Sequence, residues 1–296
     1  MRRNRVFIDI HAHAYRRHPG PLRNGKQWFS TPEQVIKRYD ETGIEKGVLL
    51  PLVNAEVYLP QSNEEILEMV EEFKGRFIPF CNIDPRALTN SAGAPLDTLL
   101  RHYRDQGCKG IGEVMPNLPF RHPLVQNLFR HVQEVGFPLI FDISDRIGGD
   151  YGLYDDPGLP QLESCLRAFP KLTILGHGPA FWADIAQLEK PGDRAGYPTY
   201  TVKEEGVVPK LFRAYPNMWG DLSAGSGANA LIRDPDYAVQ FLNEFQDRLL
   251  FGTDICNPDQ PFRQADFLIR LRDEGKISKA TFDKIAKGNA IKLLGL

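Results

Sequence analysis

The sequence predicts an α/β protein folded as a (β/α)8 (TIM) barrel, and three observations support this prediction. Runs of β-branched and aliphatic residues recur about eight times, helical patterns lie between them, and successive runs are roughly 30 to 40 residues apart. The runs are almost continuously apolar, as expected of parallel strands that helices cover. A barrel fits this series better than an open sheet, although the spacing alone also allows a doubly wound fold.

The predicted elements follow one another along the whole chain. The strands are residues 6–10, 47–52, 77–81, 110–114, 138–143, 172–175, 218–222 and 249–251. The helices predicted between them are residues 31–42, 63–73, 96–106, 124–135, 159–168 and 237–245. Thr31 followed by Pro32 is typical of a helix start, and Gly43, Gly107 and Gly136 stand where helices end. Residues 144–160 and 178–208 are rich in Gly and Pro, which predicts long loops.

Size and composition indicate an ordinary globular protein. The 296 residues suit a single barrel domain over residues 1–296, and 42% of them are hydrophobic. The net charge of -2, without long runs of one sign, disfavours a nucleic-acid partner. No apolar run reaches the roughly 18 residues of a membrane span. Residues 1–5 are basic, like the start of a signal peptide, but polar residues interrupt the apolar region that should follow. We therefore interpret them as the N-terminus of a mature protein.

The cysteines indicate a reducing compartment. The four are scattered without a C-x-x-C pair, so we expect reduced thiols in a cytoplasmic protein: Cys81, Cys108, Cys165 and Cys256. A homodimer is the assembly that soluble proteins form most often.

Polar side chains close four of the predicted strands. Functional residues of a (β/α)8 barrel lie at the C-terminal ends of its strands. The first strand is followed by His11 and His13, which point to the same side because they are two residues apart. Glu113, His177 and Asp254 close the fourth, sixth and eighth strands. Each alone has an ordinary explanation, as a core histidine, an ion pair or a helix cap.

Together these strand ends predict a divalent-metal site. Nitrogen and oxygen donors of this kind suit Zn²⁺, and also Mn²⁺, Fe²⁺ or Ni²⁺. A small-molecule substrate would then be the partner of the site.

Four motifs resemble the amidohydrolase superfamily, and most closely its amidohydrolase-related (amidohydrolase 2) branch, which includes decarboxylases similar to aminocarboxymuconate semialdehyde decarboxylase. They are Phe7-Ile8-Asp9-Ile10-His11-Ala12-His13, Gly110-Ile111-Gly112-Glu113, Ile174-Leu175-Gly176-His177-Gly178 and Leu250-Phe251-Gly252-Thr253-Asp254. The final 288–294 segment resembles the terminal helix of that branch. The resemblance covers essentially the whole chain.

The resemblance implies a role for each matched position. His11 and His13 match the first-strand metal pair, and Glu113 matches a carboxylate ligand of TatD-like members. Asp254 matches the aspartate that touches the metal and takes the proton of its water, and His177 the histidine that binds a second metal or acts as acid and base.

The fifth strand departs from the family pattern. Asp142 stands where a histidine ligand is usual, so it is a candidate ligand, a supporting group or a structural residue. We therefore expect one metal rather than two.

Three functions are compatible with these residues. The first is a metal-dependent hydrolase that uses a metal-activated water on a small-molecule amide, ester or lactone, with Asp254 and His177 catalytic. The second is a metal-dependent decarboxylase or hydratase of an unsaturated or aromatic carboxylic acid. The third is an inactive barrel that serves as a binding or scaffold protein.

Loop residues on the same face are candidates for substrate binding. Arg146 offers a bidentate contact to a carboxylate, although an exposed surface arginine explains it equally well. Aromatic residues in the loops are candidates for a pocket wall, with packing as the alternative: Trp28, Trp182, Tyr151 and Tyr154.

Overall fold

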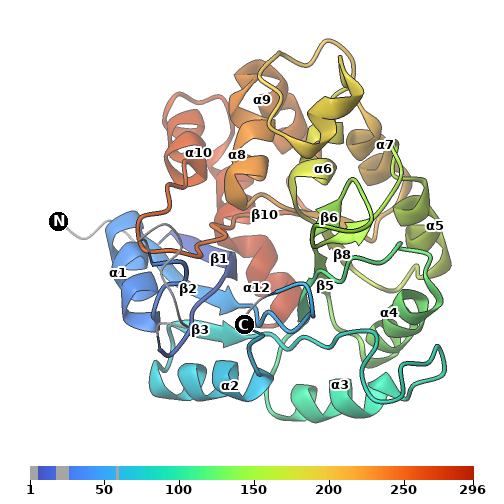
Figure 1. Cartoon of the computed structure of the whole chain (residues 1–296). Coiled ribbons are helices and arrows are strands. Elements are labelled where there is room, and N and C mark those ends of the chain that lie inside the picture. Colours follow the sequence, from blue (N-terminus) through green and yellow to red (C-terminus); the bar gives the residue numbers. More distant parts are fainter. Residues whose placement is uncertain (1–5, 18–26, 58–59) are drawn as a thin grey trace.

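The chain folds as a barrel of eight parallel strands surrounded by helices (Figure 1). The computed structural model describes residues 6–17, 27–57 and 60–296. The basic residues 1–5, read above as a mature start, lie outside the described residues.

All eight predicted strands are confirmed, with ends that shift by a few residues. They are β1 (Phe7–Ala12), β2 (Ile44–Leu49), β3 (Phe77–Pro79), β4 (Ile111–Val114), β5 (Leu139–Phe141), β8 (Ile174–Gly176), β9 (Met218–Asp221) and β10 (Leu249–Leu250). The hydrogen-bonded ladders form two sheets, β1-β2-β3 and β4-β5-β8-β9-β10. Single bridges join the sheets at both seams, Cys81 with Ile111 and Ala12 with Ile255. The strand order around the barrel is thus the chain order.

The six predicted helices are also present. They are α1 (Pro32–Thr42), α2 (Asn63–Glu72), α3 (Leu96–Asp105), α4 (Pro123–Val135), α5 (Pro160–Ala168) and α9 (Pro235–Glu244). Thr31 caps α1 in a capping box with Gln34, and Gly43 and Gly136 end α1 and α4 in the left-handed conformation. These boundaries were readable from the sequence because cap residues leave a chemical signature.

Several further helices were not predicted. They are α7 (Val207–Ala214), α8 (Ala224–Ile232), α10 (Gln264–Asp273) and α11 (Lys279–Asp283). The terminal helix expected from the resemblance at residues 288–294 is present as α12 (Asn289–Leu294), and the π-helical turn η3 (Lys284–Gly288) precedes it. The α8 sequence contains Gly225 and Gly227, and glycine weakens the helical signal. Its helical conformation therefore depends on packing more than on propensity.

Both predicted long loops contain regular structure. Residues 144–160 include β7 (Leu153–Tyr154), which pairs in parallel with β6 (Ile143–Ser144). Residues 178–208 include α6 (Pro179–Trp182), η1 (Ala183–Ile185) and η2 (Pro191–Ala195). These elements are two to five residues long, too short to show a hydrophobic period.

The barrel interior is a compact apolar cluster closed at one end by α12. Inward side chains such as Ile10, Leu50 and Ile140 pack together with Ala290 and Leu294 of that helix. Figure 1 shows α12 within the ring of strands. The polar site at the other end of the barrel therefore rests on a dry, close-packed floor.

The α12 plug leads to a stability prediction. Leu294 is 4% exposed within the interior cluster, so Leu294→Ala leaves a cavity that the rigid strands cannot fill. We expect the free energy of unfolding to fall by about 2–4 kcal/mol in urea titrations. Leu296→Ala is the control, because that side chain is 42% exposed and its loss costs less than about 0.5 kcal/mol. Equal effects would show that α12 does not seal the barrel.

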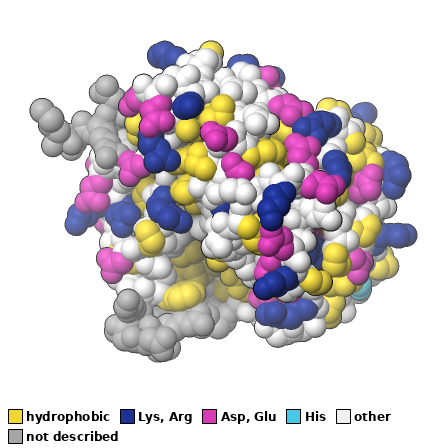
Figure 2. All heavy atoms as spheres, turned by 90° about the horizontal axis from the view of Figure 1, so that it is seen from above, with side chains coloured by type: hydrophobic (Ala, Val, Ile, Leu, Met, Phe, Trp, Pro, Cys, Tyr) yellow, Lys and Arg dark blue, Asp and Glu magenta, His cyan; other side chains and the backbone are white. Residues whose placement is uncertain are grey.

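The surface carries both charge signs. On the face in Figure 2, basic and acidic side chains are mixed among hydrophobic ones. None of the helices formed by the described residues has the length and apolar character that a membrane span requires. All four cysteines are free thiols, as expected.

Candidate metal centre

Four predicted side chains meet at the C-terminal mouth of the barrel. The Nε2 atoms of His11 and His13 are 3.0 Å apart. Each of them is 3.4 Å from Oδ1 of Asp254. Oε2 of Glu113 is 3.6 Å from the His11 nitrogen and 3.5 Å from the His13 nitrogen. Residues up to 243 positions apart in sequence, from the end of β1, from β4 and from the segment after β10, thus lie around the two histidine nitrogens. His11, His13 and Glu113 form one group of possible ligands, and Asp254 joins His13 and Cys256 in a second.

The spacing of these atoms fits one small cation. Ligand bonds of 2.0–2.2 Å in a tetrahedral zinc site place donor atoms about 3.3–3.5 Å from each other. Five of the six donor–donor separations, at 3.0–3.6 Å, lie around this edge length. Glu113 and Asp254 lie on different sides of the histidine pair, since they belong to separate groups of ligand atoms within 4.8 Å of one another. Two nitrogen and two oxygen donors form a borderline set that accepts Zn²⁺ or Mn²⁺.

In both histidines the Nδ1 atom forms a hydrogen bond, and the Nε2 atoms that face each other carry no hydrogen. Nδ1 of His11 lies 2.6 Å from Oδ2 of Asp221, and Nδ1 of His13 lies 3.0 Å from the Leu50 carbonyl oxygen. A carbonyl and an ionised carboxylate only accept, so both Nδ1 atoms carry the hydrogen. Two bare Nε2 atoms 3.0 Å apart repel unless a proton or a cation lies between them. The arrangement therefore fits a metal ion.

A bulge in β1 helps to aim His11. Asp9 pairs with Gly47 and Ala12 with Leu49, so β1 has one more residue than β2 over this stretch. A bulge of this kind turns a side chain to a new direction. Ile10 packs in the barrel interior while His11 reaches the metal centre.

Asp9 braces the two chain segments that supply three of the donors. Its buried carboxylate accepts hydrogen bonds from the amides of His11 and Thr253, at 3.0 and 2.8 Å. The Thr253 hydroxyl and Tyr39 complete its shell at 2.6 and 2.8 Å. Asp254 follows directly, and its amide donates to the His11 carbonyl. The Asp254 side chain thus has a fixed position relative to β1.

His177 lies beside this cluster. Its Nε2 is 3.6 Å from Oε1 of Glu113, the oxygen that does not face His11 and His13. Its Nδ1 contacts Oγ of Ser223 at 3.0 Å and Oδ2 of Asp221 at 3.1 Å. The Ser223 hydroxyl donates to Asp221, so it can accept from the histidine. Nε2 of His177 is therefore the atom available to a substrate.

The charges of the centre favour a bound cation. Burial opposes charge on His11, but the nearby carboxylates, with Asp221 foremost, raise its pKa well above its usual value. Burial also opposes charge on His13, yet Asp254 and Glu113 raise its pKa to about 9. Burial disfavours the Glu113 carboxylate, but His11 holds its pKa well below the ordinary range. Buried carboxylates in excess of cations require positive charge, which a divalent ion supplies.

Asp142 lies next to the four donors rather than among them. It forms a group with Glu113 and His177 whose ligand atoms lie within 4.8 Å of one another. Its Oδ1 accepts a hydrogen bond from the Ile143 amide at 2.6 Å. Burial, followed by the charge of Glu113, raises the pKa of Asp142 to about 7. The substitution of the usual histidine therefore puts a carboxyl group with a high proton affinity beside the centre.

A cavity of about 380 Å³ opens directly above the centre. His13, Glu113, Asp142, His177 and Asp254 line its base. Its walls are mainly apolar and aromatic: Trp28, Phe29, Leu52, Val57, Met115, Tyr151, Tyr197 and Cys256. This is a size and lining suited to a small organic molecule.

The structure places two of the suggested aromatic residues at this cavity and three other candidates elsewhere. Trp28 and Tyr151 line the wall. Trp182 is 1% exposed, and its indole nitrogen donates to the Asp221 carbonyl at 2.9 Å, so it packs beneath the site. The side chain of Arg146 is 56% exposed and pairs with Asp150. Tyr154 donates to Asp156. Neither Arg146 nor Trp182 is among the described residues that line this cavity.

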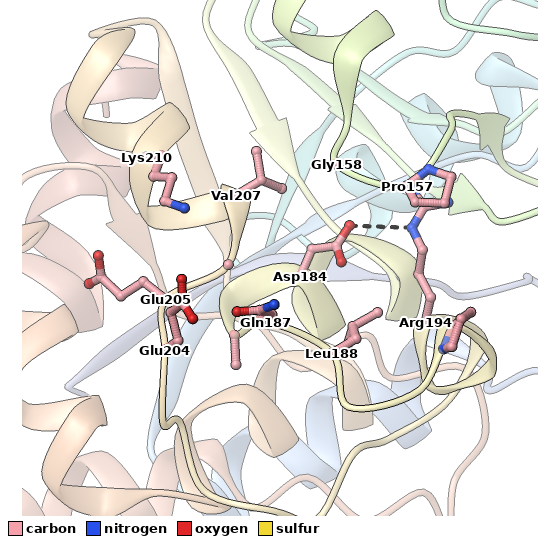
Figure 3. Close-up of a pocket in the computed structure, with 13 residues that line it drawn as sticks. Pro157, Gly158, Asp184, Gln187, Leu188, Arg194, Glu204, Glu205, Val207 and Lys210 are labelled. Carbon is pink, nitrogen blue, oxygen red and sulfur yellow. Dashed lines mark hydrogen bonds and ion pairs between the residues drawn. The ribbon is translucent and has the colours of Figure 1, made fainter.

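A larger hollow of about 510 Å³ lies elsewhere on the protein. It is bordered by the segments around Asp184 and the start of α7, and Arg194 pairs with Asp184 across it at 3.3 Å (Figure 3). None of the described residues that line it is a histidine or a cysteine. Its size alone therefore does not make it the site of chemistry.

Several residues of the centre were missed by the sequence reasoning. Asp221 ends the seventh barrel strand, β9, and the strand-end rule applied to every strand would have found it. Ser223 and Tyr197 have no such signal, because an isolated serine or tyrosine in a loop is common. Cys256, two residues after Asp254, places its sulfur 3.6 Å from Oδ1 of that residue.

The comparison with known families agrees with this geometry. A family model described as amidohydrolase matches residues 8–296. The chain belongs to the amidohydrolase family. The resemblance noted in the four strand-end motifs is thereby confirmed, and the family includes metal-dependent hydrolases and decarboxylases.

Solved structures share the fold of this amidohydrolase at low identity. An uncharacterised TIM-barrel protein from Bordetella bronchiseptica has a TM-score of 0.65 and 18% identity over 98% of both chains. A 5-carboxyvanillate decarboxylase from Novosphingobium aromaticivorans, a mutant with bound manganese, has a TM-score of 0.63 and 18% identity over 98% of this chain and 97% of that one. A probable 2-pyrone-4,6-dicarboxylic acid hydrolase from Acinetobacter baumannii has a TM-score of 0.58 and 14% identity over 98% and 100%. No curated protein matches the sequence.

Proposed function

We propose that this amidohydrolase is a metal-dependent hydrolase that cleaves an amide, ester or lactone bond in a small, uncharged molecule. The main observation is the group of four converging donor atoms, with the bare Nε2 atoms of His11 and His13 only 3.0 Å apart. The cavity above them gives a substrate direct access.

The proposed metal ligands are His11, His13, Glu113 and Asp254. A divalent cation held by them would lower the pKa of a bound water molecule to about 7 and polarise a carbonyl group. We take Zn²⁺ as the leading candidate and Mn²⁺ as the next, since the donor set suits both. The 5-carboxyvanillate decarboxylase of the same fold contains bound manganese, which supports a divalent ion in this fold.

Asp254 is the proposed proton acceptor. Its side chain is 21% exposed, whereas those of His11, His13 and Glu113 are at most 5% exposed. It is therefore the donor residue that a water molecule in the cavity can reach. The carboxylate accepts the proton of the attacking water and returns it to the leaving oxygen or nitrogen. His177 offers Nε2 to the charge that develops on the substrate.

The charge of the cavity supports an uncharged substrate. Four carboxyl groups line it, those of Glu56, Glu113, Asp142 and Asp254, and no lysine or arginine does so among the described residues. Because the described lining offers no cationic side chain to a substrate carboxylate, it favours an uncharged substrate over an anionic one.

Metal content tests this proposal directly. We expect about one equivalent of a divalent metal per chain by elemental analysis of protein purified without chelators. His11→Ala or His13→Ala removes a donor from the buried set and should lower the content at least tenfold. His102→Ala is the control, because His102 is exposed on α3. A wild-type protein without metal would instead favour the scaffold alternative.

A decarboxylase is the second candidate. The 5-carboxyvanillate decarboxylase with the same fold and the aromatic wall of the cavity both favour it. An activity assay of the metal-loaded protein with lactones, aryl esters and aromatic carboxylic acids distinguishes hydrolysis from decarboxylation. Acid formation from the neutral compounds supports hydrolysis, while CO2 release from the acids alone replaces our proposal with decarboxylation.

A further inference from the structure

The N-terminus of α8 faces the same cavity without a side-chain cap. Ala224 and Ser226, in the first turn of this nine-residue helix, line the cavity wall. Ser223 stands at the N-cap, but its hydroxyl contacts Asp221 and His177 instead of a helix amide. The left-handed Ala224, with φ of 62°, follows this turn. Ser223 therefore contacts residues of the metal centre instead of capping the helix.

Two amides of the first turn therefore lack acceptors. The Ala224 amide donates to the Thr253 carbonyl at 3.3 Å. Within the described part of the chain, the amides of Gly225 and Ser226 have no hydrogen-bond partner. Such N–H groups and the partial positive charge of a helix N-terminus attract an oxygen that bears negative charge.

Ser226 is the second, independent observation. The residue is 2% exposed, and its hydroxyl oxygen has no hydrogen-bond partner. A buried hydroxyl without a partner is costly, so proteins rarely keep one unless a ligand or water satisfies it. Rotation about its side-chain bond lets the hydroxyl donate toward an oxygen bound at the helix start.

The surroundings define where such an oxygen would lie. Ser223, immediately before the helix, is 3.0 Å from Nδ1 of His177. On the outer side, the Tyr197 ring lies against Gly225, where an added Cβ would be 3.4 Å from the ring. The helix start thus lies between the proposed catalytic groups and an aromatic wall residue.

We propose that the N-terminus of α8, together with the Ser226 hydroxyl, is an acyl-oxygen subsite. It accepts the carbonyl oxygen of an ester, lactone or amide, which becomes a carboxylate oxygen of the product. The inference rests on the proposed hydrolase function and adds the group that orients the acyl half. It also explains how a cavity rich in carboxyl groups can hold an acyl oxygen without a cationic side chain.

Benzoate, a simple aromatic acyl product, is the probe. Its dissociation constant is measured by titration calorimetry on zinc-loaded protein, for the wild type and Ser226→Ala. Loss of one hydrogen bond to a charged oxygen should weaken binding about 10- to 150-fold. The thermal stability of Ser226→Ala without ligand should equal or exceed that of the wild type, because an unpartnered hydroxyl is removed.

Ser30→Ala is the matched control. Its hydroxyl is also buried and unpartnered, but Ser30 does not line the cavity. Its dissociation constant for benzoate should stay within twofold of the wild type. The subsite is refuted if the wild type does not bind benzoate, if Ser226→Ala binds it unchanged, or if Ser30→Ala weakens it equally. Because benzoate binding requires no turnover, the binding data test the subsite even if the hydrolysis assay fails.

Discussion

Asp254→Asn should lower hydrolytic turnover by about 10²–10⁴-fold while most of the bound metal remains. The amide keeps the shape of the side chain and an oxygen donor, whereas it no longer takes a proton from water. Histidine nitrogens and Glu113 stay in place around the ion, because Asp9 and Thr253 hold this segment against β1 independently of the Asp254 side chain. The measurements are kcat on a hydrolysed ester and the metal content of the same preparation.

Asp259→Asn is the matched control for this prediction. It makes the same chemical change on an exposed aspartate of the same loop, five positions further along. We expect its kcat and metal content to equal those of the wild type. If Asp254→Asn keeps full turnover, Asp254 is not the proton acceptor. If it loses metal in parallel with activity, its main role is ligation.

The barrel was predictable because its strands and caps leave local signatures. The strands are apolar runs in the order in which they pair, and Thr31 and Gly43 mark helix ends by their own chemistry. The elements that escaped prediction lack such signals. The helix α8 contains two glycines, and η1 has only three residues.

The centre was predictable only in part for the same physical reason. His11, His13, Glu113 and Asp254 converge because parallel strands end at one face of the barrel. The direction of a loop side chain is not set by strand register. Trp182 and Arg146, suggested for substrate binding, therefore do not line the cavity, whereas Tyr197 and Ser226, which line it, were not found.

Asp221→Asn should weaken metal binding about 10- to 100-fold, although Asp221 is not one of the four proposed ligands. One carboxylate oxygen accepts from His11 and Ser223 at 2.6 and 2.9 Å and lies 3.1 Å from Nδ1 of His177. Burial disfavours the Asp221 carboxylate, but His11, and after it His177, hold the pKa of Asp221 far below its usual range. An amide that turns its NH2 group toward His11 would force the hydrogen onto Nε2, the atom that faces the metal.

The measurement for Asp221→Asn is the metal dissociation constant, by competition with a chelator, together with thermal unfolding with and without metal. A 10- to 100-fold loss of affinity reduces the stabilisation that saturating metal provides by about 1.4–2.7 kcal/mol. A purely structural role would lower the metal-free and metal-loaded stabilities equally and leave the dissociation constant unchanged. That result would contradict the role proposed for Asp221.

Asp142→Asn separates this effect from a general loss of negative charge near the centre. The ligand atoms of Asp142, Glu113 and His177 lie within 4.8 Å of one another, and Asp142 is buried, as Asp221 is. It differs from Asp221 because its pKa is raised to about 7 by burial and by Glu113, and because no histidine Nδ1 donates to it. Neutralising it should therefore change metal affinity by less than about threefold. A loss as large as that of Asp221→Asn would mean that total charge, rather than the tautomer of His11, controls metal binding in this barrel.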